Sequence, residues 1–346
     1  MIKTIFTVVL TVVLSPIVTA AMQPMTDEEL GIQTGQAFFQ IDRSTNPQNV
    51  DFTKFTFGMD IDISVNADLL ELGRYDRSGE ALGSSDIRIN DFALGSVNND
   101  GTLNPFHITD PFFELAFEDV SGKEELVGIR LGFGGARGAL SGNIESLTGN
   151  VNVLIRDTAA GLANADNGLA DLTAGLLKNS PIEAEAALVR ADGTPDNIRA
   201  TKIGIPNGDT FDIVPDGWWD RLKLSVAAGL GIGGLDCVSG SFGSCRRAQI
   251  TATNCAAAGI NVCFNLSDYR TLQVGNKQSD GSFTEASGLF LSFQSKSVSW
   301  IDTGKVTPTV SGAFMNIPNG GLTVTLEEAF NGTQRLRTKF MDPYYD

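Results

Sequence analysis

Hydrophobic and polar positions alternate strictly along the chain from Lys54 to Leu69. The odd positions are apolar: Phe55, Phe57, Met59, Ile61, Ile63, Val65, Ala67 and Leu69. The even positions are polar or glycine. Side chains of a β-strand point alternately to its two faces, so this period of two predicts one strand with a buried face and a wet face. At about 3.3 Å per residue, the strand would be roughly 50 Å long.

Shorter alternating segments follow, and turn sequences such as Asn99-Asp100-Gly101 separate them. Consecutive strands joined by short turns predict an antiparallel meander over residues 52–156. Alternation returns in a second β region, residues 181–346, for example at 222–226. We therefore expect a mainly β protein with a long antiparallel sheet, arranged as a sandwich or an open groove, and one inserted amphipathic helix.

The inserted helix is predicted over residues 157–180, where the period changes. Gly-Leu pairs recur every seven residues and place four leucines on one helical face: Leu162, Leu169, Leu172 and Leu176. This helix either packs on the sheet as part of the core or covers an open face of the sheet. Its polar face carries aspartates instead of lysine and arginine, which disfavours a helix lying on a membrane surface.

Residues 1–20 have the pattern of a signal peptide. Lys3 precedes a short apolar run, and Val18-Thr19-Ala20 provides a small-residue cleavage site. We expect a protein exported to the cell envelope, periplasmic or associated with a membrane, and held at the inner membrane if the signal stays uncleaved. Residues 21–51 are interpreted as an N-terminal capping segment, in which Thr26 and Glu29 have capping-box spacing.

Four cysteines in an exported chain predict two disulfides. They are Cys237, Cys245, Cys255 and Cys263. A hairpin centred near Ile250 would join Cys237 to Cys263 and Cys245 to Cys255. Two local loops would instead join each cysteine to the next along the chain. Both pairings stay open at this point, and the spacing lacks the close cysteine pair typical of a zinc site.

Composition favours a hydrophobic role. The net charge of -16 argues against nucleic acid and against anionic membrane surfaces as partners. Phenylalanine (21) far outnumbers tyrosine (4), which suits dry surfaces, either a core or the lining of a ligand site. The candidate ligand-lining residues combine the first strand with the helix: Phe55, Phe57, Met59, Ile61, Ile63, Val65, Leu162, Leu169, Leu172 and Leu176.

Catalytic chemistry finds little support. The single histidine, His107, disfavours Ser-His-Asp catalysis and histidine-rich metal sites. Trp218-Trp219 is interpreted as a half-buried pair at a loop entry, with an exposed binding platform as the alternative. Five carboxylates on the predicted wet faces are interpreted as solvated: Asp60, Asp62, Asp68, Glu114 and Glu118. We expect no enzyme, no catalytic residue, no cofactor and no bound metal.

Residues 25–36 read Met-Thr-Asp-Glu-Glu-Leu-Gly-Ile-Gln-Thr-Gly-Gln. This Met-x-Asp-Glu-x-Leu module with its following Gly-Gln resembles the start of a family of exported Gram-negative envelope proteins, where it leads into long alternating strands. Some members look like components of pilus or surface assemblies. Others resemble the accessory proteins (component B) of alkane uptake in marine oil-degrading bacteria, which work with an outer-membrane channel of the fatty-acid-transporter type.

Two functions follow as hypotheses. The first is a non-enzymatic envelope protein that assists the uptake or binding of a hydrophobic small molecule, an alkane or a lipid, with an outer-membrane channel protein as partner. The second is a subunit of a surface or pilus-type assembly or of an adhesion structure, which would self-associate through the edges of its sheet.

Overall fold

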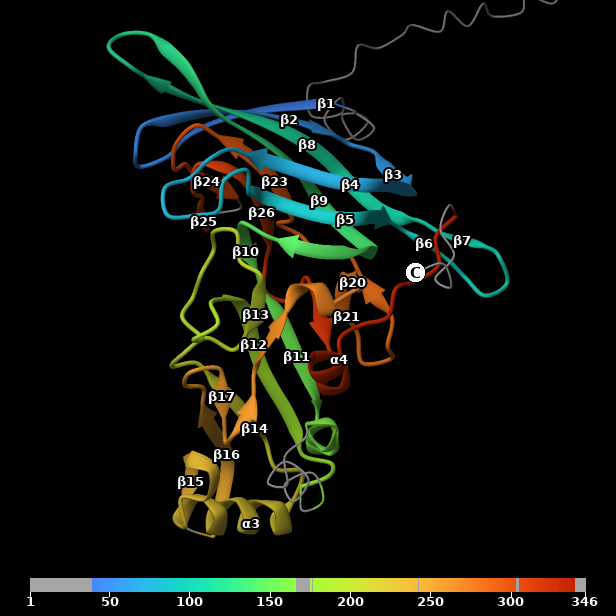
Figure 1. The fold of residues 1–346 in the computed structure, drawn as a ribbon, viewed down its shortest axis with the longest axis vertical. Coiled ribbons are helices and arrows are strands. Elements are labelled where there is room, and N and C mark those ends of the chain that lie inside the picture. Colours follow the sequence, from blue (N-terminus) through green and yellow to red (C-terminus); the bar gives the residue numbers. More distant parts are fainter. Residues whose placement is uncertain (1–38, 166–174, 176, 242, 303–304, 340–346) are drawn as a thin grey trace, which may run out of the picture. The chain divides into compact units, whose positions relative to one another are not determined.

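The computed structural model describes residues 39–165, 175, 177–241, 243–302 and 305–339 (Figure 1). The predicted signal peptide lies outside these residues, as do Leu169, Leu172 and Leu176 of the predicted helix. The described part of the chain is mainly β, as predicted. Among its helices, none is long and apolar enough to cross a membrane.

An 11-stranded sheet holds most of the first half of the chain. Its main path runs β1 (Phe39–Thr45), β2 (Val50–Phe57), β8 (Phe106–Asp119), β9 (Glu124–Ser146), β23 (Phe290–Gln294), β26 (Gly312–Ile317) and β10 (Gly149–Val151). Four further strands join it beside this path: β3 (Asp60–Ile63), β4 (Val65–Arg74), β5 (Ser85–Leu94) and β20 (Thr271–Val274). Among these described pairs, β10 with β26 is parallel and the others are antiparallel.

An 8-stranded sheet follows the path β15 (Leu235–Ser241), β16 (Ser244–Thr251), β14 (Thr210–Ile213), β12 (Pro181–Val189), β11 (Val153–Thr158) and β27 (Thr323–Val324). Strands β13 (Lys202–Gly204) and β19 (Cys263–Asn265) extend it from β12. The helical elements are η1 (Ala159–Asn164), α3 (Trp218–Gly229), η2 (Ile232–Gly234), η3 (Leu266–Asp268) and α4 (Leu326–Asn331). Four short ladders complete the fold: β6–β7 (Ser96–Val97, Leu103–Asn104), β17–β18 (Ala256–Ala257, Ile260–Asn261), β21–β22 (Asn276–Lys277, Phe283–Thr284) and β24–β25 (Ser299–Asp302, Lys305–Pro308).

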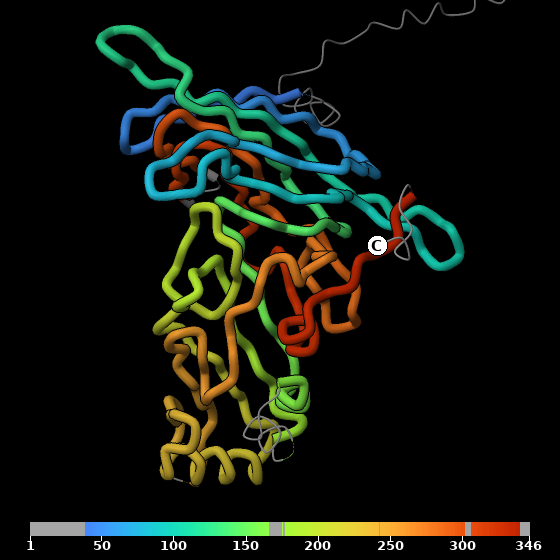
Figure 2. The backbone as a smooth tube through the Cα atoms, in the orientation of Figure 1, coloured from blue at the N-terminus to red at the C-terminus, as the bar shows by residue number. Residues whose placement is uncertain are grey.

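The two β regions expected from the sequence share their sheets. Strands β20, β23 and β26 come from the second region and pair within the sheet begun by the first. In Figure 2 the red and orange segments accordingly lie among blue and green ones. One large cluster of buried residues draws on both sheets, for example Ile89 and Ile144 from one and Ile182 and Ile213 from the other.

The predicted long strand over Lys54–Leu69 is wrong as a single element, because the segment forms β2, β3 and β4 with breaks between them. The first break is a bulge at Gly58-Met59, where the Met59 carbonyl accepts a hydrogen bond of 3.0 Å from the Asp110 amide. The longest described strand is instead β9, with 23 residues. Apolar and polar residues keep alternating through the bulge, so the pattern alone does not show where the strand is interrupted.

The bulge also moves the odd residues from one face of the sheet to the other. Through β8, the ladder connects Phe55 to Leu131 of β9 and Ile61 to Ala136 of β9. Positions 131 and 136 differ by an odd number along a continuous strand, so their side chains lie on opposite faces. Phe55 and Phe57, before the bulge, therefore share one face, and Ile61 and Ile63, after it, pack against the main core.

Burial around β8 and β9 is the reverse of what the pattern predicted. The even face, expected to be wet, lies under the hairpin β24–β25, whose Trp300 is fully buried against Phe52 with ring centroids 5.3 Å apart. Glu114 is consequently only 3% exposed, so its interpretation as a solvated carboxylate is wrong. The odd, apolar face is the partly exposed one, with Leu131 at 44%.

Glycines of β9 make room for aromatic rings on the covered face. A Cβ placed on Gly132 would lie 2.3 Å from the Phe112 ring, closer than any real contact. Phe112 thus covers the backbone of its cross-strand partner. Gly134 and Gly135, which follow Phe133, instead face Asp110, Thr109 and Glu285.

Two segments have a secondary structure that differs from the one the sequence pattern predicted. Leu222, Leu224 and Val226 alternate with polar residues but belong to α3, so the predicted strand at 222–226 is wrong. A short apolar run fits either period, and here the helical one prevails. Within the predicted helix at 157–180, β11 extends to Thr158, the 3₁₀ helix η1 follows, and 166–174 and 176 lie outside the described residues.

Candidate hydrophobic-ligand site

An apolar cavity of ≈ 100 Å³ lies between the end of the 8-stranded sheet and α3. Its walls come from β14, β15, β16, α3 and the segment around β17 and β18. The residues that line it are Leu162, Leu177, Phe211, Ile213, Lys223, Leu224, Ala227, Ile232, Gly233, Leu235, Ile250, Ala257, Ala258, Ile260 and Val262. Among these described residues, Lys223 is the one with a charge, so the cavity offers dispersion contacts and almost no hydrogen bonds.

Alternation within β14 directs two side chains into this cavity. Phe211 and Ile213 are buried, whereas Asp212 between them points outward and forms an ion pair with Arg247 of β16. Ile250 of β16 pairs in register with Leu235 of β15 and adds a further part of the wall. The local period of two thus creates an apolar interior and a charged exterior on the same strands.

Helix α3 closes the cavity with its Leu224 and Ala227 side chains. Asp220 holds the helix in place, since its Oδ2 accepts a hydrogen bond of 3.2 Å from the Ser180 hydroxyl. Its Oδ1 accepts a bond of 2.9 Å from the Lys223 ammonium. The Lys223 charge therefore points away to a carboxylate, and the lysine contributes its aliphatic stem to the wall.

Two local disulfides frame the cavity, which settles the pairing that the sequence left open. Cys237 joins Cys245, with Cα atoms 5.8 Å apart, and links β15 to β16. Cys255 joins Cys263, with Cα atoms 5.1 Å apart. The second loop contains four of the lining residues: Ala257, Ala258, Ile260 and Val262.

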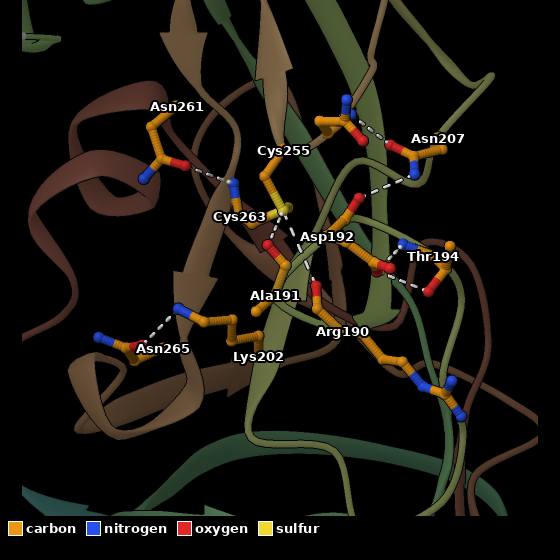
Figure 3. Close-up of a disulfide and its surroundings, with 11 residues drawn as sticks. Arg190, Ala191, Asp192, Thr194, Lys202, Asn207, Cys255, Asn261, Cys263 and Asn265 are labelled. Atoms are coloured by element: carbon orange, nitrogen blue, oxygen red, sulfur yellow. Dashed lines mark hydrogen bonds between the residues drawn. A yellow bond between two sulfur atoms is a disulfide. The ribbon is translucent and has the colours of Figure 1, made fainter.

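Figure 3 shows the polar contacts around the Cys255–Cys263 disulfide. The Cys263 amide donates to the Asn261 side-chain oxygen at 3.2 Å. Asn207 reaches across, accepting from the Asn254 amide at 2.8 Å and donating to the Asp192 carbonyl at 2.8 Å. The loop that carries part of the apolar wall is thus held by a disulfide and by amide side chains.

The structure does not bring the predicted lining residues to one site. Leu162 lines the cavity and is 2% exposed. Phe55 and Phe57 lie on the partly exposed face of the 11-stranded sheet, and Val65 is 37% exposed. Met59 lies at the bulge, and Ile61 and Ile63 pack against the core. Leu169, Leu172 and Leu176 lie outside the described residues.

Sequence reasoning missed most of the cavity wall. Phe211 and Ile213 carried a signal, because they alternate with Thr210 and Asp212, but four residues are too few to stand out. The apolar residues between Cys255 and Cys263 were a second signal, since a disulfide loop rich in Ala, Ile and Val has little reason to be solvated. The assembly of these segments around α3 depends on long-range pairing.

The partly exposed face of the 11-stranded sheet forms a second apolar surface, here called the sheet face. One row of side chains crosses six strands: Ile41, Phe55, Phe113, Leu131, Leu291 and Met315. Phe55 and Phe113 stack with ring centroids 4.5 Å apart. Ile41 is 53% exposed, and it lies on β1, whose outer edge is the end of the sheet path.

Charged groups near these surfaces make structural contacts. The His107 Nδ1 lies 2.8 Å from the Asp62 carboxylate on the 11-stranded sheet, and neither residue lines the cavity. Within the described residues, no group of three or more His, Cys, Asp and Glu side chains could hold a metal ion. The arrangement around the cavity is thus suited to holding an apolar group.

No protein-family model, curated protein or solved structure matches this chain.

Proposed function

We propose that this chain is a non-enzymatic cell-envelope protein that binds the alkyl part of a hydrophobic molecule, an alkane or a lipid, in the cavity beneath α3. The observation that carries the proposal is the cavity of ≈ 100 Å³ with one charged residue among those that line it. A space of this kind lowers the free energy of a hydrocarbon group relative to water by removing its apolar surface from solvent.

The size of the cavity limits the ligand. A cavity of about 150 Å³ in another protein holds one benzene molecule and excludes water. At ≈ 100 Å³, the space beneath α3 suits the end of an alkyl chain. The rest of the ligand would stay outside the cavity, which suits a protein that takes up a hydrophobic molecule briefly and passes it on.

Two features support the envelope as the compartment. The two disulfides agree with an oxidising environment, because such bonds persist mainly in exported proteins. The pattern of residues 1–20 is that of an export signal. The resemblance of residues 25–36 supports an outer-membrane channel as the protein partner, and the sheet face offers an apolar surface for such a contact.

A cavity-filling variant tests the proposal. Ala227 lines the cavity and the neighbouring Ala228 does not, although both are half-buried on α3. We expect A227L to weaken binding of a dodecanoic acid probe at least tenfold and A228L to change it less than twofold. Binding is measured by titration calorimetry on the oxidised protein, and ligands carried through purification are identified by mass spectrometry after solvent extraction. Equal affinities of the two variants, or no uptake of the probe by the unaltered protein, would refute alkyl binding in this cavity.

The exposed edge of β1 favours a second candidate function, a subunit of a surface assembly. All seven residues of β1 are exposed, and among the described strands β1 pairs with β2 alone. Such an edge can accept a strand from another molecule. Light scattering across a concentration series tests this, with Ile41→Lys as the variant that breaks the apolar row at the edge; a monomer at all concentrations for both proteins would exclude assembly through β1.

A further inference from the structure

Large hydrophobic side chains are exposed on α3, on the turn that follows it and on β15. Strand β15 packs against α3 (Figure 1). This group, here called the apolar tip, consists of Trp218 (60% exposed), Trp219 (65%), Val226 (45%), Leu230 (70%), Ile232 (42%) and Val238 (51%). The indoles of Trp218 and Trp219 contact each other with ring centroids 4.3 Å apart. Monomeric soluble proteins rarely leave clustered apolar groups of this size in water, so the tip indicates a binding surface.

Helix α3 is apolar on two sides. Its inner side carries the buried Leu224 and covers the cavity. On the outer side, Trp219, Leu222, Val226 and Leu230 follow a spacing of three and four residues and form one stripe. A helix that is hydrophobic all round is normally buried. The outer stripe of α3 therefore lacks a covering layer among the described residues.

The charge around the tip differs from that of the whole chain. Residues 210–251 contain four cationic and four acidic side chains, a net charge of zero, whereas the chain as a whole carries -16. The cations are Arg221, Lys223, Arg246 and Arg247, and the acids are Asp212, Asp216, Asp220 and Asp236. This part of the chain, where two tryptophans are exposed, therefore repels phosphate groups less than the acidic chain as a whole does.

The tip is also held in a fixed shape. The Cys237–Cys245 disulfide links the two strands of the hairpin β15–β16, and Cys245 is fully buried. The Gly243 amide, in the turn of this hairpin, donates to the Ser225 hydroxyl of α3 at 2.8 Å. A surface that is already ordered loses little conformational entropy when it binds.

We propose that the apolar tip binds the surface of a phospholipid bilayer. Tryptophan concentrates at the membrane–water interface, where its ring lies at headgroup level. Leu230 and Ile232, which flank Gly231 in the turn after α3, reach the acyl boundary below the indoles. The absence of net charge in this part of the chain suits the zwitterionic headgroups of phosphatidylcholine. The inference goes beyond the proposed function, because the tip can bind a bilayer whether or not the cavity holds a ligand.

Native tryptophan fluorescence provides the test. The chain has three tryptophans, of which Trp218 and Trp219 lie in the tip and Trp300 is fully buried under the other sheet. The full oxidised protein is mixed with phosphatidylcholine vesicles whose acyl chains carry bromine, a short-range quencher. We expect quenching of the exposed indoles and co-sedimentation with vesicles. The Trp300 emission stays unquenched and serves as the internal reference.

Matched variants assign the binding to the tip. W218S/W219S and, separately, L230S are expected to reduce the vesicle-bound fraction at least tenfold. L82S is the control, since Leu82 is 86% exposed in the loop between β4 and β5, and we expect a change of less than twofold. Because all four side chains are exposed, their replacement leaves the core unchanged, which far-ultraviolet circular dichroism checks.

Three results would overturn the proposal. The first is a protein that neither sediments with vesicles nor loses fluorescence to brominated lipid. The second is an equal effect of L230S and L82S. The third is a dimer in light scattering that W218S/W219S converts to a monomer without any vesicle binding, which would assign the tip to a contact between two copies. The calorimetric assay of A227L uses no vesicles, so its failure and the failure of the tip are separate outcomes.

Discussion

The guanidinium of Arg130 donates through Nε to the Glu114 carboxylate at 2.7 Å, and this pair is buried inside the 11-stranded sheet. Arg130 is 0% exposed and Glu114 is 3% exposed. The rings of Phe112, Phe290 and Trp300 lie about the guanidinium at 5.1, 5.0 and 5.2 Å. A cation among three rings, paired with one carboxylate, thus links β8 to β9 on the covered face of the sheet.

Removing one partner of that pair is predicted to destabilise the fold. Glu114→Gln leaves the Arg130 charge buried without its counter-ion, which costs about 3–5 kcal/mol in comparable cases. The control is Glu183→Gln, which breaks the exposed cross-strand pair with Arg156 and should cost less than about 1 kcal/mol. Urea unfolding at pH 7 measures both. Similar losses for the two variants would show that the Arg130–Glu114 pair is not buried in solution.

The change of face at Gly58-Met59 predicts that substitutions of Ile61 and Phe57 destabilise the fold to different extents, although both positions are odd. Ile61→Ser places a hydroxyl against the main core and should lower the free energy of unfolding by about 1–3 kcal/mol. Phe57→Ser changes the partly exposed sheet face and should cost less, while reducing association at high concentration. Chemical unfolding and light scattering distinguish the two effects. A continuous strand would instead make both substitutions equivalent.

Both disulfides are predicted to stabilise the protein to a similar extent, because each joins cysteines separated by 8 positions. Loop-closure entropy gives about 2–3 kcal/mol for rings of this size. C255A/C263A and C237A/C245A should therefore lower stability alike. Only the first releases the segment with Ala257, Ala258, Ile260 and Val262, so we expect it to weaken dodecanoic acid binding more. Calorimetry of the two double variants checks this, and an equal loss of affinity would contradict it.

Three turns of the same sequence type predict a dependence of stability on pH. Asp100, Asp192 and Asp280 each accept hydrogen bonds from the hydroxyl and amide of the residue two positions later, which hold the pKa of each carboxyl below 3.8. The lowered folded-state pKa means that stability is present above the unfolded value and is lost as the pH falls through the folded one.

The triple variant D100N/D192N/D280N should therefore lose less stability than the unaltered protein when the pH is lowered from about 5 to about 2. A second variant, T102V/T194V/S282A, removes the hydroxyl donors and keeps the carboxyls. It should also make stability depend less on pH, because losing the hydroxyl donors brings the folded-state pKa of each carboxyl closer to its unfolded value. Urea midpoints across the pH range provide the measurement, and parallel curves for all three proteins would exclude these turns as its source.

The mainly β architecture was predictable because alternation is a local property of the sequence. Segments such as 113–117 and 127–133 alternate and form parts of β8 and β9. The bulge after Phe57 was not predictable, since a bulge inserts a residue without disturbing the apolar order around it. The prediction of which face is buried also failed. Periodicity shows which residues share a face but not which face is covered, and the covering hairpin β24–β25 comes from a segment more than 150 residues away from β8.

The candidate cavity was harder to predict than the fold. Leu162 was identified through its heptad spacing, but its neighbours in the cavity come from β14, β15, β16 and α3. The first three segments are short, and α3 was interpreted as a strand. Cysteine positions suggested disulfides correctly, whereas their connectivity required the distances between Cα atoms. Trp218 and Trp219 are 60% and 65% exposed, so the interpretation of this pair as half-buried is wrong.

Strand β9 has a consequence for how this protein acquires its structure. It pairs with β5 and β8, which precede it closely, and with β20 and β23, whose residues follow more than 120 positions later. One side of the strand therefore waits for the last quarter of the chain, with its backbone amides and carbonyls unpaired in the meantime. High contact order of this kind slows folding and exposes adhesive edges. A chain that lacks its last quarter is therefore expected to leave this side of β9 open to association with other chains.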